Sequence, residues 1–192
     1  MRNLKDIILE KLVISKDKLQ QFTEHPKTND DLRKLVKYAM TINGNNCDLN
    51  HIDVSKIKDF SMIFKNLDFD GDISNWDVSK VTVFNGIFGR CYKLETIRLT
   101  NWNLASATEA KDIFYNCNSL VNVDISNWVL NLPTSGVFSG TSKLRYIKCN
   151  DIPTLNILAP LLSTKTSDAF GIILCKQDDL SSIDVLVFFI KA

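Results

Sequence analysis

Cysteine and histidine are the side chains of this sequence with the widest chemical repertoire, and their spacing does not fit a metal site. No two of the five cysteines form a C-x-x-C pair, and neither histidine has metal-ligand spacing to a cysteine. The positions are Cys47, Cys91, Cys117, Cys149, Cys175, His25 and His51. We therefore expect no zinc site. An odd number of cysteines without an export signal predicts reduced thiols.

One acidic stretch has part of the pattern of a calcium-binding loop. Leu67–Ser74, LDFDGDIS, contains D-x-D-G-D. An EF-hand loop closes with a bidentate glutamate at its twelfth position. Counted from Asp68, that position is Ser79, so we expect no calcium here. The chain also lacks a glycine-rich phosphate loop and the G-x-S-x-G and H-E-x-x-H motifs, and we predict no enzymatic activity and no cofactor.

The spacing of the tryptophans reveals an internal repeat, and this repeat determines which residues of the chain lie in line with one another. Each of the three follows an asparagine, and the two intervals between them are equal. The tryptophan column is Ile52, Trp76, Trp102 and Trp128. Four aligned segments each end in phenylalanine, namely Leu49–Phe64, Ile73–Phe88, Leu99–Phe114 and Ile125–Phe138. The resulting period, about 25 residues, lies in the range of leucine-rich repeats.

A unit of this length cannot bury its apolar side alone, so the units must stack. Stacking places each aromatic column against itself in the next unit. The segments Thr96–Thr100, Asn122–Ser126 and Tyr146–Asn150 alternate in the manner of strands and would lie parallel, about 4.8 Å apart. On the opposite side, Ser79–Phe88 and Leu104–Phe114 are predicted to form short helical or 3₁₀ turns.

One column of the repeat carries charges of alternating sign along the predicted sheet. It contains Asp72, Arg98, Asp124 and Lys148, and it is joined on the same face by Thr96, Asn122 and Tyr146. The column has two interpretations: a ladder of exposed ion pairs, each contributing about 0.2–1 kcal/mol, or a strip that recognises a partner. The alternation and a net charge of +1 argue against a polyanionic ligand, so we expect no nucleic acid.

Two further columns are predicted to be structural. The asparagine column, Asn75, Asn101 and Asn127, could satisfy backbone groups of the loops with stacked amides. Cys91 and Cys117 also stack, and buried packing is the favoured role, with oxidation to a disulfide as the alternative.

The segments that flank the array differ in character. The N-terminal residues have the apolar spacing of two helices, and the first contains Leu4, Ile7, Ile8 and Leu12. The second begins at Thr28, which can cap it, and has Asp30 and Asp31 in its first turn and Gly44 at its exit. Its apolar stripe is formed by Leu32, Leu35, Val36 and Met40. This pair would cap the array or dock a partner. After Asp151 we expect a helix, Leu155–Leu162, and two strands, Ala169–Lys176 and Ile183–Ala192. The strands would extend the sheet or form a hairpin.

The unit ISNWDVSKVT, Ile73–Thr82, with its phenylalanines and cysteine, resembles the BspA-like leucine-rich repeat family of bacterial surface and phage-encoded proteins. The resemblance covers Leu49 to about Cys149. It implies a repeat fold used in adhesion and protein binding, and it implies no catalytic residues.

These observations lead to one interpretation of the chain. The predicted fold is α/β, a short leucine-rich-repeat-type solenoid with parallel strands, divided into a helical cap (1–42), four repeats (43–150) and an α/β capping region (151–192). The predicted function is non-enzymatic protein binding, as an intracellular bacterial or phage-encoded binder or inhibitor, with surface adhesion or host contact as the alternative. We expect a cytoplasmic monomer, since no signal peptide or membrane span is evident, with a protein partner of unknown identity.

Overall fold

The computed structural model describes residues 25–132, 134–151, 153–154, 157–158 and 172–174 of the 192-residue chain. It has a mixed α/β architecture with one long helix, α3 (Asn29–Asn43), and a parallel sheet. The strands are β1 (Thr96–Arg98), β2 (Asn122–Asp124), β3 (Tyr146–Lys148) and β4 (Ile172–Leu174). The predicted first helix and the predicted strand Ile183–Ala192 lie outside the described residues.

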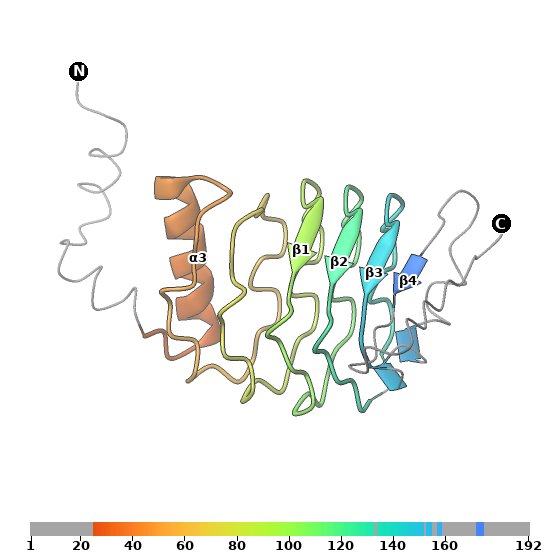
Figure 1. Ribbon diagram of the computed structural model, residues 1–192. Helices are drawn as coiled ribbons and strands as arrows, with labels where there is room; N and C mark the ends of the chain where they lie inside the picture. Colours follow the sequence, from red (N-terminus) through yellow and green to blue (C-terminus); the bar gives the residue numbers. More distant parts are fainter. Residues whose placement is uncertain (1–24, 133, 152, 155–156, 159–171, 175–192) are drawn as a thin grey trace, which may run out of the picture.

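The strands lie in the order β1-β2-β3-β4, so each strand pairs with the next one along the chain (Figure 1). Thr96 pairs with Asn122, Asn122 with Tyr146, and Tyr146 with Ile172. The chain therefore makes one complete turn between successive strands, and we call each such turn a coil. The pairing of β4 shows that this C-terminal segment extends the parallel sheet, which was one of the two predicted alternatives.

A second line of pairing runs along the opposite side of the coils, where helical turns were predicted. Val83 forms parallel bridges with Asp59 and with Glu109. Its neighbour Phe84 donates its N–H to the Glu109 carbonyl at 2.8 Å, and Phe88 donates to Ile113 at 2.9 Å. The prediction of helical turns at Ser79–Phe88 and Leu104–Phe114 is wrong, because these N–H groups donate to the next coil. The alternative of 3₁₀ turns is present in these fully described segments only as single bonds to carbonyls three residues back, such as Ala107 N–H to Leu104 at 2.9 Å.

The backbone shows why no helix forms there. In each of the four coils that the structure describes on this side, two residues, four apart, adopt left-handed conformations with φ between 55° and 74°. A left-handed residue ends a right-handed helix, and it turns the chain at the same point of each coil. The two columns are Met62, Gly86, Asp112, Gly136 and Asn66, Arg90, Asn116, Gly140. Glycine lowers the strain at the positions that it occupies.

A phenylalanine ladder fills the interior and confirms the predicted column. Phe64, Phe88, Phe114 and Phe138 stack with centroid separations of 5.2, 5.3 and 5.5 Å and interplanar angles of 12°, 6° and 6°. All four are fully buried. Offset stacking of this kind stabilises a pair by about 0.5–1.5 kcal/mol beyond the burial of area.

The tryptophan column is confirmed as buried, and its members differ in their partners. Trp76 and Trp102 stack at 6.5 Å with an interplanar angle of 9°. Their Nε1 groups donate to the carbonyls of Leu49 (2.8 Å) and Ile73 (3.3 Å), each in the preceding coil. Trp128 stacks on Phe114 at 6.3 Å, and its Nε1 has no hydrogen-bond partner within the described part of the chain.

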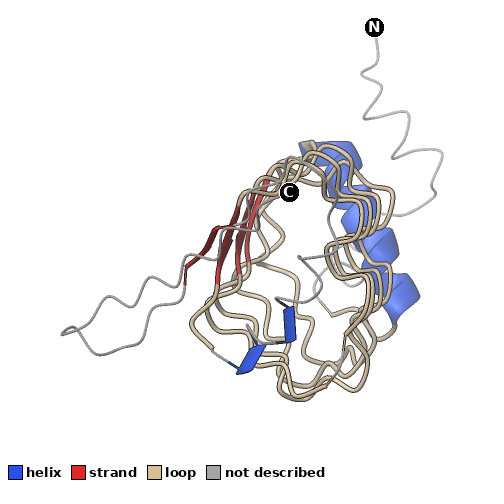
Figure 2. Ribbon diagram, turned by 90° about the vertical axis from the view of Figure 1, so that its right-hand side faces the viewer, coloured by secondary structure: helices blue, strands red, loops and turns tan. Residues whose placement is uncertain are grey.

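Helix α3 begins and ends where the sequence predicts. The Thr28 Oγ1 accepts the N–H of Asp31 at 3.1 Å, and the N–H of Gly44 donates to the Met40 carbonyl at 2.9 Å. The helix buries Leu32, Leu35 and Val36 against the first coil. In Figure 2 it lies on the side of the coils away from the strands.

Two side chains of α3 satisfy the backbone of the first coil. Asn29 donates to the carbonyls of Asp59 (3.0 Å) and Ser61 (2.9 Å). Arg33 donates to the carbonyls of Ile63 (2.7 Å) and Lys65 (2.9 Å), and also to that of Met62.

The corresponding carbonyls of the second coil receive backbone hydrogen bonds instead. Val83, Asn85, Ile87 and Gly89 accept N–H groups of the first coil at 2.8–3.0 Å. The side chains of Asn29 and Arg33 thus occupy the place of a preceding coil. The domain boundaries expected from the sequence, at 42 and 150, stay predictions.

We predict that Arg33→Met lowers the free energy of unfolding by about 1–3 kcal/mol, because it leaves backbone acceptors unpaired at the start of the array. Methionine keeps an apolar stem and a high helix propensity. Equilibrium unfolding in urea measures the change. Lys34→Met, at an exposed position of the same helix, is the matched control. Equal urea concentrations at the midpoint of unfolding for the two variants would contradict the assigned role of Arg33.

Candidate functional site

The candidate site is the outer surface of the strands, which we call the strand face. The strands β1, β2 and β3 each bury their central residue, with Ile97, Val123 and Ile147 at 2–5% exposure. Because side chains alternate along a strand, the flanking residues point away from the core. They are Thr96, Arg98, Asn122, Asp124, Tyr146 and Lys148, and all are exposed or half-buried. The structure therefore brings these six predicted residues together on one surface.

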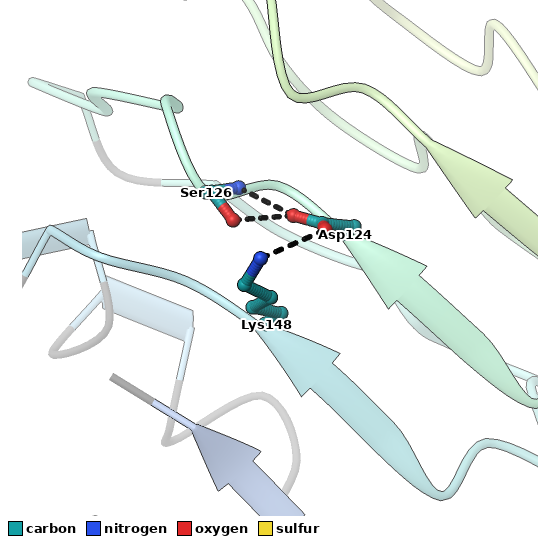
Figure 3. A network of polar contacts seen from close by, with 3 residues as sticks. All are labelled: Asp124, Ser126 and Lys148. Atoms are coloured by element: carbon teal, nitrogen blue, oxygen red, sulfur yellow. Dashed lines mark hydrogen bonds and ion pairs between the residues drawn. The ribbon is translucent and has the colours of Figure 1, made fainter. Parts of the chain in front are cut away.

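The predicted charge column is also present in the register of the sheet. Arg98 pairs with Asp124, and Asp124 with Lys148, as Cα neighbours. The Lys148 Nζ lies 3.3 Å from the Asp124 Oδ2, with the two side chains 49% and 21% exposed (Figure 3). Arg98 makes no ion pair with any residue that the structure describes. An exposed ion pair of this kind contributes up to about 1 kcal/mol.

Asp72, the remaining member of the column by the spacing of the repeat, lies outside the named strands. It forms an isolated parallel bridge with Asp48 of the first coil. Asp48 therefore extends the column by one further negative charge. The sequence reasoning began the column at Asp72 and did not include it.

Asp72 and Asp124 also have a local structural role that the sequence reasoning missed. The Oδ1 of Asp72 accepts the N–H of Ser74 at 2.9 Å, and that of Asp124 accepts the N–H of Ser126 at 3.1 Å and also its hydroxyl. This Asx-turn closes the chain just after the strand position. The same D-x-S pattern, with the same bond, occurs at Asp53, Asp59 and Asp77. The pattern was visible in the sequence and has a known turn chemistry.

The turns affect the acidity of three carboxyl groups. The backbone N–H and side chain of Ser74 lower the pKa of Asp72. The hydroxyl and the N–H of the serine two residues on lower the pKa of Asp53 and of Asp77. The Nδ1 of His25 lies 3.0 Å from the Oδ2 of Asp53, and this contact lowers the pKa of Asp53 further.

The asparagine column lies at the loops beyond the strand face. The N–H of Asn75 donates to the Oδ1 of Asn50 at 2.8 Å, so the amide that satisfies this loop belongs to Asn50, one position earlier in its coil. Asn101 and Asn127 are exposed and line a shallow polar groove. The groove is also lined by Asn103, Ser126, Trp128, Val129, Asn150 and Asp151.

Cys91 and Cys117 are fully buried free thiols. Their Sγ atoms donate to the carbonyls of Phe64 (3.2 Å) and Phe88 (2.9 Å), each one coil earlier. The hydrogen bond with Cys117, followed by burial, raises the pKa of Cys91 well above its ordinary value. A protonated, enclosed thiol is a poor nucleophile and a poor metal ligand.

The thiols of Cys47 and Cys149 are also buried, whereas Cys175 lies outside the described residues. Within the described ranges there is no group of three or more histidine, cysteine, aspartate or glutamate residues that could hold a metal ion. No helix found there has the length and apolarity that crossing a membrane requires.

Comparison with known proteins identifies a family. The family model described as "Mycoplasma protein of unknown function, DUF285" matches residues 30–146. No curated protein and no solved structure matches the chain.

We predict that acid weakens the fold through the Asx-turn aspartates. A carboxyl group with a lowered pKa stabilises the folded state above its unfolded pKa of about 3.9, and this contribution is lost as the pH falls further. The free energy of unfolding should therefore decrease between about pH 5 and pH 3. Urea unfolding at a series of pH values measures the slope.

The variant Asp53→Asn/Asp72→Asn/Asp77→Asn should show a flatter dependence on pH, because asparagine keeps the acceptor oxygen and does not titrate. The corresponding triple alanine variant, which loses the acceptor, should be less stable at neutral pH as well. An unchanged slope in the asparagine variant would refute the assignment.

Proposed function

The chain belongs to the DUF285 family, described as Mycoplasma proteins of unknown function, and from this premise we propose that it is a non-enzymatic protein-binding module. The observation that supports the proposal most strongly is the strand face itself. It presents outward-pointing polar, charged and aromatic side chains on a parallel sheet whose inward-pointing residues Ile97, Val123 and Ile147 are buried.

We further propose that the coils form a leucine-rich-repeat-type solenoid related to the BspA-like proteins. The parallel pairing of each strand with the next along the chain and the four-membered phenylalanine ladder support this proposal. Repeat arrays of this kind offer extended surfaces for partners. A non-catalytic role is supported by the buried thiols and by the engagement of Asp72 and Asp124 in turns.

The composition of the strand face fits recognition of a protein. Tyr146 is 47% exposed on β3, and aromatic and arginine side chains are enriched at binding hot spots. Arg98 has its guanidinium free of ion pairs with the described residues and can donate to a carboxylate in bidentate fashion. Charges of both signs favour a mixed-charge protein surface over a polyanion.

Two biological settings follow from the proposal. The first is an intracellular bacterial or phage-encoded binder or inhibitor of a bacterial protein, and the second is a surface protein in adhesion or host contact. Fractionation of the native host separates them, because recovery of the protein in the surface wash would exclude the first.

We predict that the strand face captures a partner from lysate of the native host. Immobilised wild-type protein should retain at least one protein that Arg98→Glu/Lys148→Glu does not retain, as measured by quantitative mass spectrometry. Lys56→Glu/Lys80→Glu changes the same number of charges at exposed lysines away from this face, and it should capture the partner normally. Equal capture by all three proteins would exclude the strand face as the binding surface.

A further inference from the structure

The order of charges across the strand face is self-complementary. The bridge joins Asp48 to Asp72, the strand register joins Arg98 to Asp124 and Lys148, and the sequence repeat places Asp72 in the same column as Arg98. Its negative end is therefore formed by the early coils and its positive end by β3. A surface with this distribution repels a copy of itself in the same orientation and attracts a copy in which the order of the coils is reversed.

A twofold axis parallel to the strands, placed over the gap between β1 and β2, produces this reversal. Each coil then faces the coil that lies equally far on the other side of the axis. Arg98 of one copy faces Asp124 of the other, and Asp72 faces Lys148. These four charges therefore each meet a charge of the opposite sign, whereas Asp48 lies opposite the β4 position of Leu174 and gains no charged partner.

The adjacent column fits the same arrangement. Two residues before each charge are Asp70, Thr96, Asn122 and Tyr146. Across the axis, Thr96 faces Asn122, and Asp70 faces Tyr146, whose phenol can donate to a carboxylate. Both exposed polar columns are thus complementary in one and the same orientation.

The ion pair within each copy leaves capacity for a second partner. Lys148 is 49% exposed and uses one of three ammonium protons on Asp124. It can therefore donate to Asp72 of another copy without breaking the pair shown in Figure 3.

We infer that the strand face binds a second copy of this chain, with the strands parallel and the coils in opposite order. The inference rests on the proposed function only in that this face binds protein. Three-residue strands spaced about 4.8 Å apart make the strand face roughly 10 Å by 20 Å. Its area, about 200 Å², is well below the ~800 Å² that each partner contributes to a standard interface. The dimer is therefore weak, with a dissociation constant in the micromolar range or above, and sensitive to salt.

The experiment uses two charge reversals on the full chain. Asp72→Lys places lysine opposite Lys148, and Lys148→Glu places glutamate opposite Asp72, so each variant alone should dimerise at least tenfold more weakly than wild type. In an equimolar mixture both contacts become attractive again, and a heterodimer should form. Sedimentation equilibrium at low salt, with one variant labelled, measures all three cases.

Matched controls distinguish the loss of a dimer contact from the loss of the folded structure. Asp77→Lys removes the same kind of Asx-turn bond as Asp72→Lys, from a loop off the strand face, and Lys80→Glu reverses an exposed lysine elsewhere. Both should dimerise as wild type does. Restored association in the mixture also excludes misfolding as the cause of its loss in the single variants.

A wild-type chain that stays monomeric up to its solubility limit would overturn the inference, as would dimerisation unaffected by either reversal or a mixture that stays monomeric. These results are distinguishable from failure of the proposed function. A monomeric chain that still captures a partner through Arg98 and Lys148 retains the binding function and loses the dimer. A dimer that captures nothing retains the self-association alone.

Discussion

Hydrogen bonds between coils are the constraint on which the rest of this structure depends. Along the side opposite the strands, alternate N–H groups of one coil donate to carbonyls of the next, as Phe60 does to Val83 and Phe64 to Ile87. The phenylalanines of the aromatic ladder belong to the same residues that form these bonds, since Phe64 and Phe88 donate to the next coil and stack on one another. A coil without a neighbour would leave this row of backbone groups unpaired, which is why the structure needs α3 at its start.

The sequence predicted the elements whose side chains repeat in type. The phenylalanine column, the buried tryptophans, the parallel strands and the limits of α3 follow from apolar spacing and capping residues, and the structure agrees on each. The strands are shorter than predicted, and in β2 the Asx-turn of Asp124 begins at the last residue of the strand. The D-x-S pattern carried that information, but periodicity alone does not show where a strand stops.

The features that the sequence did not predict depend on backbone conformation and on distant neighbours. Methionine and arginine occupy left-handed positions at Met62 and Arg90, and these residue types give no sign of such a conformation. Short apolar segments around them therefore resembled helical turns. The contact of Arg33 with Ile63 and Lys65 spans about thirty residues, and no local pattern encodes it. On the strand face, residue identities were predictable, whereas the extension of the charge column to Asp48 required the register.

The replacement of a missing coil by Asn29 and Arg33 bears on how such a chain can change in length during evolution. Among the described residues, the side-chain hydrogen bonds between the helix and the array are made only with the first coil. Each inner coil instead contacts its neighbours through the same pattern of backbone hydrogen bonds and the same stacked phenylalanine. Duplicating or deleting an inner coil as a complete unit would preserve every junction, while loss of the first coil would separate the helix from its acceptors. Relatives of different length are therefore expected to vary in the middle and to keep their beginning.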